Sequence, residues 1–284
     1  MKITQIAKIC GGQDGAIFEN FLFRFDHKGS CTVYDLSTLP EFNGDKAEPI
    51  AGFTIGEEPI PHSNAVCFGK QYYAEGDEFP LLYSNIYNNY RAAEDPLRGV
   101  CCVYRITRKE ERFSAKLVQL IKIGFIEYSN LWLSSEADKR PYGNFLVDPQ
   151  RDRYYGFTMR DAADSTRYFV FDLPNVFEGE PDEVYGVKSV VLGAEDIKGY
   201  FDCEYHRFLQ GGCVNNGKIY STEGFTESCD NPPALRVISL DDEKQELFVP
   251  FGDFGLTVEP ELIDFWGETC CYADNHGNLY TIEF

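Results

Sequence analysis

Short runs of alternating apolar and polar residues fill most of the 284-residue chain. Alternation with a period of two is typical of half-buried β-strands, whereas an amphipathic helix repeats with a period of about 3.6 residues. No apolar stripe with helical spacing is sustained along the chain. The chain also contains 23 Phe and 18 Tyr, and aromatic residues are enriched in strands. The pattern predicts an all-β protein.

Five short segments repeat one strand-like pattern. They are VYDL (Val33–Leu36), VYRI (Val103–Ile106), VFDL (Val170–Leu173), VISL (Val237–Leu240) and TIEF (Thr281–Phe284). Each of the first four is followed, after a polar or Pro-containing gap, by another apolar run. These runs are EPIAGFTI, AKLVQLIKI, VKSVVL and ELFVPF. A unit of this size that recurs along a chain indicates a repeat architecture.

The fifth segment has no follower, and the N-terminal segment can supply the missing strand. KITQIAKI (Lys2–Ile9) matches KLVQLIKI (Lys116–Ile123), the run after the second repeat, without a gap. DHKGSCTVYDL (Asp26–Leu36) aligns in the same way with DNHGNLYTIEF (Asp274–Phe284), and both contain the Asp and Gly of a hairpin turn. A first strand that pairs in the last sheet would close a ring of sheets and cover an exposed edge.

We therefore predict a five-bladed β-propeller, with four antiparallel strands in each blade and the ring closed by the N-terminal strand in the last blade. The five units are expected at 9–55, 61–123, 140–192, 202–251, and 259–284 together with 1–9. A single domain would then span residues 1–284. The alternative is that Ile126–Pro141 links two separate domains.

One end of the channel in such a ring collects the first residues of the innermost strands and the loops between second and third strands. The ligand-binding candidates expected there are His62, Asn64, Asn85, Tyr142, Asn144, Arg160, Tyr205, Gln210 and Glu223. Amides and carboxylates bind hydroxyl groups, and aromatic faces cover the C–H patches of a sugar ring. These residues predict a small polar ligand, carbohydrate-derived. The alternative is that the channel end is polar in any propeller and that Asn and Asp occupy turns for backbone reasons.

Four carboxyl residues are candidates for catalysis, namely Asp14, Glu204, Glu259 and Glu261. Glycoside hydrolysis needs two carboxyl groups, about 5–5.5 Å apart for retention or about 6.5–9.5 Å apart for inversion. Clustered carboxylates also raise one another's pKa. His62 or His206 could act as a general base instead. Because the chain contains 46 acidic residues, composition alone also places carboxylates near any chosen point, and a glycoside hydrolase or phosphorylase activity stays one of two possibilities.

The net charge of −20 argues against two classes of partner. A polyanion repels the phosphates of nucleic acids and the headgroups of anionic membranes, and no segment approaches the roughly 18 apolar residues of a membrane span. The ten cysteines include the adjacent pairs Cys101-Cys102 and Cys270-Cys271 but no C-x-x-C motif. Because no secretion signal is present, we expect reduced thiols in the cytoplasm, with no metal and no cofactor.

The predicted ring resembles the five-bladed propellers of glycan-acting enzymes, the arabinanase, fructosidase and xylosidase type. In blade number it also resembles sugar-binding lectins. The enzymes of this type use three acidic residues from the inner strands of successive blades, and the resemblance implies that Asp14 is the catalytic base. Blades two and three offer His62 with Asn64, and Tyr142 with Asn144, where those enzymes have carboxylates.

A second class of function is a non-catalytic scaffold that presents its loops to a protein partner. Such a scaffold is expected to expose apolar or aromatic patches away from the channel. A ligand-binding propeller is expected to concentrate polar side chains at one end of the channel.

Overall fold

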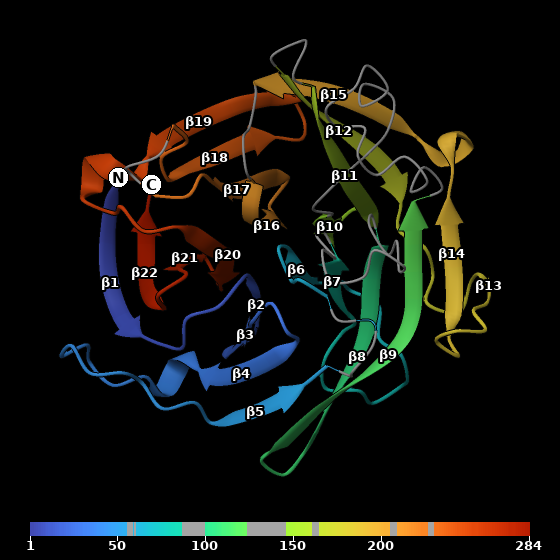
Figure 1. The fold of residues 1–284 in the computed structure, drawn as a ribbon, viewed down its shortest axis with the longest axis horizontal. Coiled ribbons are helices and arrows are strands. Elements are labelled where there is room, and N and C mark those ends of the chain that lie inside the picture. Colours follow the sequence, from blue (N-terminus) through green and yellow to red (C-terminus); the bar gives the residue numbers. More distant parts are fainter. Residues whose placement is uncertain are drawn as a thin grey trace.

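The computed structural model describes residues 1–55, 59, 61–86, 100–123, 146–160, 165–204, 209–226 and 230–284. In these residues the chain forms five sheets arranged around a common axis (Figure 1). Four antiparallel strands build each blade, with the first strand nearest the axis and the last strand at the rim. The predicted all-β class and the five-bladed ring are confirmed.

The strands of each blade are given from the axis outwards. Blade one contains β2 (Gly15–Phe18), β3 (Phe21–Phe25), β4 (Ser30–Asp35) and β5 (Ala51–Thr54). Blade two contains β6 (Val66–Phe68), β7 (Leu82–Ile86), β8 (Val100–Lys109) and β9 (Arg112–Ile123). Blade three contains β10 (Leu146–Asp148), β11 (Arg153–Arg160), β12 (Ser165–Asp172) and β15 (Gly199–Glu204). Blade four contains β16 (Leu209–Asn215), β17 (Lys218–Glu223), β18 (Ala234–Ser239) and β19 (Lys244–Pro250). Blade five contains β20 (Pro260–Trp266), β21 (Thr269–Asp274), β22 (Asn278–Glu283) and β1 (Lys2–Lys8).

The N-terminal strand closes the ring as predicted. Strand β1 pairs antiparallel with β22, with Lys2 opposite Glu283, and a bulge lies between Gln5 and Ala7. The two ends of the chain therefore lie side by side (Figure 1). The internal match of Lys2–Ile9 to the run after the second repeat is explained, because β1 and β9 are both fourth strands of their blades.

The two hairpin turns that align in the sequence also have the same structure. In each turn the Asp carboxylate accepts a hydrogen bond from the N–H four residues later, that of Ser30 (2.9 Å) or Asn278 (2.9 Å). Gly29 and Gly277 have φ angles of 80° and 83°, a left-handed conformation that glycine adopts without a steric cost. The predicted Asp and Gly turn is confirmed in both blades.

Five hydrophobic clusters fill the five spaces between neighbouring blades. Their representative members are Phe23 and Phe68 between blades one and two, Val103 and Phe171 between two and three, Phe157 and Ile219 between three and four, Leu235 and Tyr272 between four and five, and Leu22 and Leu279 between five and one. Each blade is thus buried on both faces, and full burial of one such side chain contributes about 1.5–3 kcal/mol. The ring is held together mainly by these five interfaces.

The adjacent cysteines illustrate this double burial. Cys101 packs between blades two and three, whereas Cys102 packs between blades one and two. Cys270 and Cys271 likewise belong to different clusters. Neighbouring residues of a strand point to opposite faces of its sheet, so each cysteine pair serves two interfaces. The nine described cysteines are free thiols.

The prediction that VKSVVL is the outer strand of blade three is wrong. This run forms β14 (Lys188–Leu192), which pairs in parallel with β9 of blade two from Gln119 to Ile123. Together with β13 (Glu180–Pro181), it extends blade two to six strands. Figure 1 shows both strands outside β9, at the rim of the ring. Residues 173–198 therefore form an excursion from blade three that packs on its neighbour.

The predicted start of blade four at residue 202 is also wrong. Gly199–Glu204 forms β15, which pairs with β12 as the outer strand of blade three. The inner strand of blade four begins at Leu209. The outer position of blade three, predicted for VKSVVL, is occupied by β15 instead.

The helices in the described parts of the chain are short 3₁₀ segments: η1 (Leu36–Thr38), η6 (Ala194–Asp196) and η7 (Phe251–Phe254). None of the helices in these parts is long and apolar enough to cross a lipid bilayer.

Candidate functional site

The inner strands of blades one, two and four meet through one carboxyl group. Asp14 immediately precedes β2, and its Oδ2 accepts hydrogen bonds from the N–H of Val66 (2.9 Å) and the N–H of Gly212 (3.4 Å). Its own N–H donates to the carbonyl of Ser63 (3.1 Å). Asp14 is completely buried. The inner-strand position predicted for Asp14 is correct.

Burial gives the Asp14 carboxyl unusual electrostatics. It raises the pKa of Asp14 well above its ordinary value, and the N–H groups of Val66 and Gly15 and the charge of Arg24 offset part of that effect. The Oδ1 atom of Asp14 has no hydrogen-bond partner. A buried acceptor that lacks a donor costs about 1–3 kcal/mol, so this oxygen is available to a donor that enters the site.

A second buried carboxyl, Glu261, lies at the start of β20 in blade five. Its Oε1 accepts a hydrogen bond from Nε2 of Gln13 (3.2 Å), and its Oε2 has no partner. Burial raises the pKa of Glu261 well above its ordinary value; the charge of Arg24 lowers it, and nearby Glu259 raises it further. Glu261 is therefore biased toward its protonated form, which can donate a proton.

Arg24 is the buried cation of this region and was not among the predicted site residues. It lies on β3, and Nη2 donates to the carbonyls of Gly12 and Asp274, both at 2.9 Å. Its Nε and Nη1 have no hydrogen-bond partner. Burial lowers the pKa of Arg24, and the charges of Glu261 and Asp14 raise it. The sequence did contain a signal, because a lone Arg interrupts the apolar run FLFRF.

Glu259 connects blades four and five at the same end of the inner strands. Its Oε1 accepts from Nε2 of Gln210 (2.9 Å), and its Oε2 accepts from Nδ2 of Asn275 (2.8 Å). Gln210 also donates to the carbonyl of Gly224 (3.1 Å). Glu259 is partly exposed, whereas Gln210 is buried. The prediction that these two residues lie together at one end of the axis is correct.

We call these residues the axial polar cluster: Gln13, Asp14, Arg24, Gln210, Glu259 and Glu261. A glycine lets the inner strands approach closely at its centre. A Cβ atom on Gly211 would lie 1.8 Å from the carbonyl oxygen of Glu261 and 2.9 Å from Oδ1 of Asp14. No other residue fits at position 211 without moving the backbone, so the inner strands of blades four and five are in close contact at this point.

Blade two contributes three of the predicted ligand-binding residues next to this cluster. Asn64 and Asn85 are buried, and Nδ2 of Asn85 donates to the carbonyl of Ala65 (2.9 Å). His62 is partly exposed, and its ring centroid lies 6.2 Å from that of His27. The intervening Ser63 has a φ of 61° and donates its N–H to the carbonyl of Asn85 (3.1 Å). This strained turn fixes the segment that bonds to Asp14.

Two of the predicted residues contact Arg236 on β18, which is not part of the axial polar cluster. Glu204 is exposed at the outer edge of blade three, where it lies 3.5 Å from Nη1 of Arg236 and accepts from Gln245. Glu223 is buried within blade four and accepts two hydrogen bonds from the guanidinium of Arg236, at 2.8 and 3.2 Å. The position at the start of an inner strand predicted for Glu204 is wrong, since its segment belongs to the third blade.

Five further candidates lie wholly or partly outside the described residues. Tyr142, Asn144 and Tyr205 lie outside the described residues, and so does His206. Arg160 is the last residue of β11, but its side chain is outside the description. Within the described parts of the chain, no three His, Cys, Asp or Glu side chains are grouped so that they could hold a metal ion.

No protein family model matches the chain, and no curated protein sequence matches it. Among solved structures, the glutaminyl cyclase of Myxococcus xanthus is similar, with a TM-score of 0.50 and 10% identity over 100% of this chain and 96% of that one. The computationally designed Ika8 protein has a TM-score of 0.37 at 9% identity, covering 99% of each chain. BamB from Moraxella catarrhalis has a TM-score of 0.35 at 8% identity, covering 99% of this chain and 62% of that one. At 10% identity the first likeness shows a shared fold alone.

Proposed function

We propose that the axial polar cluster binds a small, polyhydroxylated ligand, derived from a carbohydrate, at the end of the inner strands. The observation that carries the proposal is unused hydrogen-bonding capacity among buried charged groups. Oδ1 of Asp14, Oε2 of Glu261, and Nε and Nη1 of Arg24 are all buried without a partner. Groups of this kind are normally satisfied in a folded protein, and a ligand or ordered water would satisfy them here.

The mixture of acceptors and donors supports a hydroxylated ligand. The two carboxyl groups can accept hydrogen bonds, and the Arg24 guanidinium can only donate them. A sugar hydroxyl does both, so neighbouring hydroxyls can bridge a carboxyl oxygen and a guanidinium N–H. Gln13, His62 and Glu259 are partly exposed and lie where such a ligand would first meet the protein.

An acid–base activity on the same ligand is a second candidate function. It rests on one pair, because Glu261 has a raised pKa and lies close enough to Glu259 for that carboxylate to contribute to the shift. A protonated carboxyl beside a carboxylate is the arrangement that glycoside hydrolysis uses for a general acid and its partner. In this form of the proposal, Glu261 donates the proton and Glu259 is the base or nucleophile.

The test is a thermal-shift and ligand-observed NMR screen against mono-, di- and oligosaccharides and polyols. We expect a binding sugar to raise the melting temperature by about 5 °C at a hundredfold excess over Kd. The Glu261→Gln variant should lose most of this shift, because the amide replaces an acceptor and cannot carry the acidic proton. Its unliganded melting temperature should stay within about 2 °C of wild type, since Gln has nearly the same shape.

The control is Glu195→Gln, which removes an exposed carboxylate far along the chain from the cluster and should leave the shift unchanged. A library in which no carbohydrate or polyol stabilises the wild-type protein would rule out the ligand class. A shift that survives undiminished in Glu261→Gln would place the binding site elsewhere. Hydrolysis of a binding glycoside by wild type, absent in Glu261→Gln, would select the enzymatic form.

A further inference from the structure

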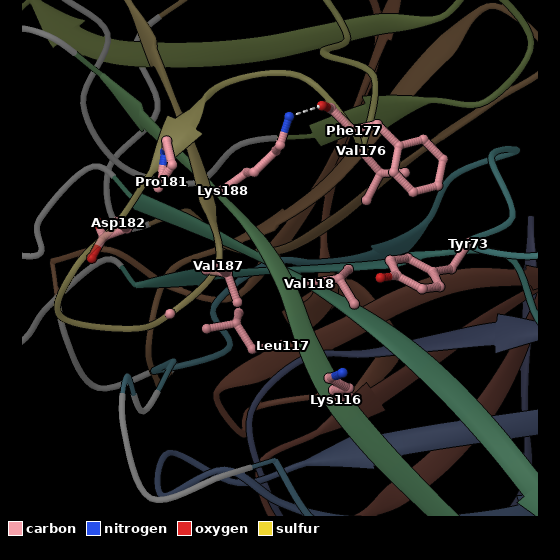
Figure 2. A pocket seen from close by; sticks show the side chains of 11 residues that line it. Tyr73, Lys116, Leu117, Val118, Val176, Phe177, Pro181, Asp182, Val187 and Lys188 are labelled. Carbon is pink, nitrogen blue, oxygen red and sulfur yellow. Dashed lines mark hydrogen bonds between the residues drawn. The ribbon is translucent and has the colours of Figure 1, made fainter.

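A cavity of about 400 Å³ lies at the rim of blade two, separate from the axial polar cluster (Figure 2). Its floor is the first half of β9, and its walls come from the excursion of blade three and from Tyr73. The lining residues are Tyr73, Lys116, Leu117, Val118, Val176, Phe177, Pro181, Asp182, Gly186, Val187 and Lys188. The volume lies within the range of about 300–1,000 Å³ that small-molecule sites occupy. We call this the rim pocket.

The cavity exists because β14 begins to pair with β9 only at Gln119. The preceding residues of β9 pair with β8 on one side, and the chain before β14 bows outwards around their other side. Gly186, with a φ of 67°, and Gly179, with a φ of 99°, allow the turns of this bow. The rim pocket is therefore a direct result of the excursion that sequence analysis assigned to the wrong blade.

Buried hydrogen bonds fix the excursion to blade two. Nε2 of Gln119, which is completely buried, donates to the carbonyls of Asn175 (2.8 Å) and Glu178 (3.1 Å). The N–H of Val176 donates to Oε1 of Gln71 (3.2 Å). These contacts hold the wall in place without a ligand, and pockets for small molecules are usually formed in advance in this way.

The rim pocket is lined by both polar and apolar residues, and one of the apolar residues, Phe177, is unusually exposed. Phe177 has 56% of its surface exposed and its ring centroid lies 5.6 Å from that of Tyr73. Val176, Leu117 and Val118 complete the apolar surface around them. A large exposed aromatic beside a hollow is a surface that gains from being covered by an apolar group.

The charges available in the rim pocket are positive. Asp182 lines it, but its Oδ2 accepts from Nζ of Lys122 (2.6 Å), and its Oδ1 accepts from the N–H groups of Val184 and Tyr185. Lys116 and Lys188 form no ion pair with any carboxylate in the described parts of the chain. Lys188 donates to the carbonyl of Phe177 (2.5 Å), which leaves two of its three N–H donors for another acceptor.

We propose that the rim pocket binds a small amphiphilic carboxylate, a molecule with one anionic group and an aromatic or branched aliphatic body. The ammonium groups of Lys188 and Lys116, which line the pocket, would attract the carboxylate, and the body would cover Phe177 and Tyr73. The net charge of −20 repels anions from the molecule as a whole. The two lysines, which have no ion-pair partner in the described parts of the chain, would attract an anion at the pocket. Figure 2 shows Lys188 and Lys116 on opposite sides of Val118, and the Tyr73 hydroxyl on the side of its ring that faces Val118.

The experiment compares three probes of one shape, 4-phenylbutyrate, 4-phenylbutan-1-ol and 4-phenylbutylamine, by ligand-observed NMR and titration. The carboxylate should bind with a Kd of about 1 mM, typical of a ligand of this size, and the alcohol should bind about tenfold more weakly. The amine should bind more weakly still. In the Lys116→Met/Lys188→Met variant the carboxylate should fall to the affinity of the alcohol, whereas Phe177→Ala should weaken both probes alike.

Lys188 also donates to the carbonyl of Phe177, so its substitution changes both charge and structure. Lys116→Met removes a charge and leaves this contact in place. It should reduce carboxylate binding by about two- to fivefold, as for an exposed ion pair. Lys28→Met, at an exposed hairpin turn, and Glu261→Gln should leave the three affinities unchanged. Three results would overturn the proposal. They are no binding of the carboxylate, equal binding of the amine, and a preference for the carboxylate that persists in the double variant. Because Glu261→Gln tests the axial cluster separately, either proposal can fail without the other.

Discussion

Asp264 is the second acidic residue of the inner strand β20, after Glu261, and its carboxyl bridges two blades. Its Oδ2 accepts from the N–H of Ile17 on β2 (2.6 Å), and its Oδ1 accepts from the N–H of Phe265 (2.8 Å). Burial raises the pKa of Asp264 to about 7, although these N–H groups and the thiol of Cys213 act to lower it. A pKa of about 7 means that the charge of Asp264 should change within the accessible pH range.

This pKa predicts how stability depends on pH. A carboxyl with a pKa near 3.8 in the unfolded chain and about 7 in the folded protein favours folding while it is protonated, and that contribution is lost as pH rises from about 4 to 7. Asp264→Asn removes the titration. The free energy of unfolding of the variant, measured relative to wild type, should therefore rise by about 4 kcal/mol between pH 4 and pH 8. Urea unfolding at a series of pH values measures this difference.

Asp253→Asn provides the matched control, because Asp253 is exposed in η7 and its substitution should show no such slope. The test depends on how the difference in unfolding free energy changes with pH, and not on the size of that difference at any one pH. Asn can accept through one oxygen only, so one of the two N–H groups loses its partner at every pH. A difference between variant and wild type that stays flat from pH 4 to pH 8 would contradict the assignment.

At the scale of elements, one repeat position serves two different purposes. Gln5 and Gln119 occupy equivalent places in the fourth strands β1 and β9, as the gapless alignment of their segments shows. Gln119 is buried and holds the excursion through two backbone carbonyls. Gln5 is partly exposed and donates to Oδ1 of Asn278 (3.2 Å) on the neighbouring strand. The same residue type therefore occupies both repeat positions, but only in blade two does it bind the segment that leads to β14.

Gln119→Leu should release the excursion without opening the ring. Leu has a similar size but no donor, so the carbonyls of Asn175 and Glu178 lose their partner, a change that costs about 1–3 kcal/mol. Hydrogen–deuterium exchange should increase across 173–192 and stay unchanged in blades four and five. Gln5→Leu is the equivalent substitution elsewhere in the ring and should leave exchange in 173–192 as it is. Equal protection of 173–192 in wild type and Gln119→Leu would show that β14 is held by its strand pairing alone.

The blades, their number and the closing strand could be predicted because each depends on local alternation and internal similarity. The position of β14 could not, since alternation shows which face of a strand is buried but not which sheet receives it. The side chains that hold the segment before β14 against blade two, Gln71 and Gln119, are distant from it in sequence. For the site, inner-strand starts correctly located Asp14, Gln210, Glu259 and Glu261. Arg24 was missed because it lies on a second strand and reaches the cluster from the side.

At the scale of the whole molecule, the ring has one break in its covalent connection, and noncovalent contacts close it. That break lies in blade five, where β1 and β22 come from opposite ends of the chain. Hydrophobic clusters fill the spaces on both sides of blade five, as they do between the other blades. Because a hydrophobic cluster joins every pair of neighbouring blades, we expect the position of the break to matter little to the stability of the ring.

A circular permutant tests this equivalence. Joining Phe284 to Met1 with a short Gly/Ser linker and opening the chain between Asn43 and Gly44 moves the break to blade one, where β5 would pair with β4 as β1 now pairs with β22. Both residues at the new ends are exposed, and the space around Gly44 is open. We expect one cooperative thermal transition within about 5 °C of wild type, because exposed loops tolerate new termini. A permutant opened between Cys102 and Val103, inside the buried strand β8, should fail to fold. If the first permutant were also unfolded or melted in two steps, the closure by β1 would have a special role that the other interfaces cannot replace.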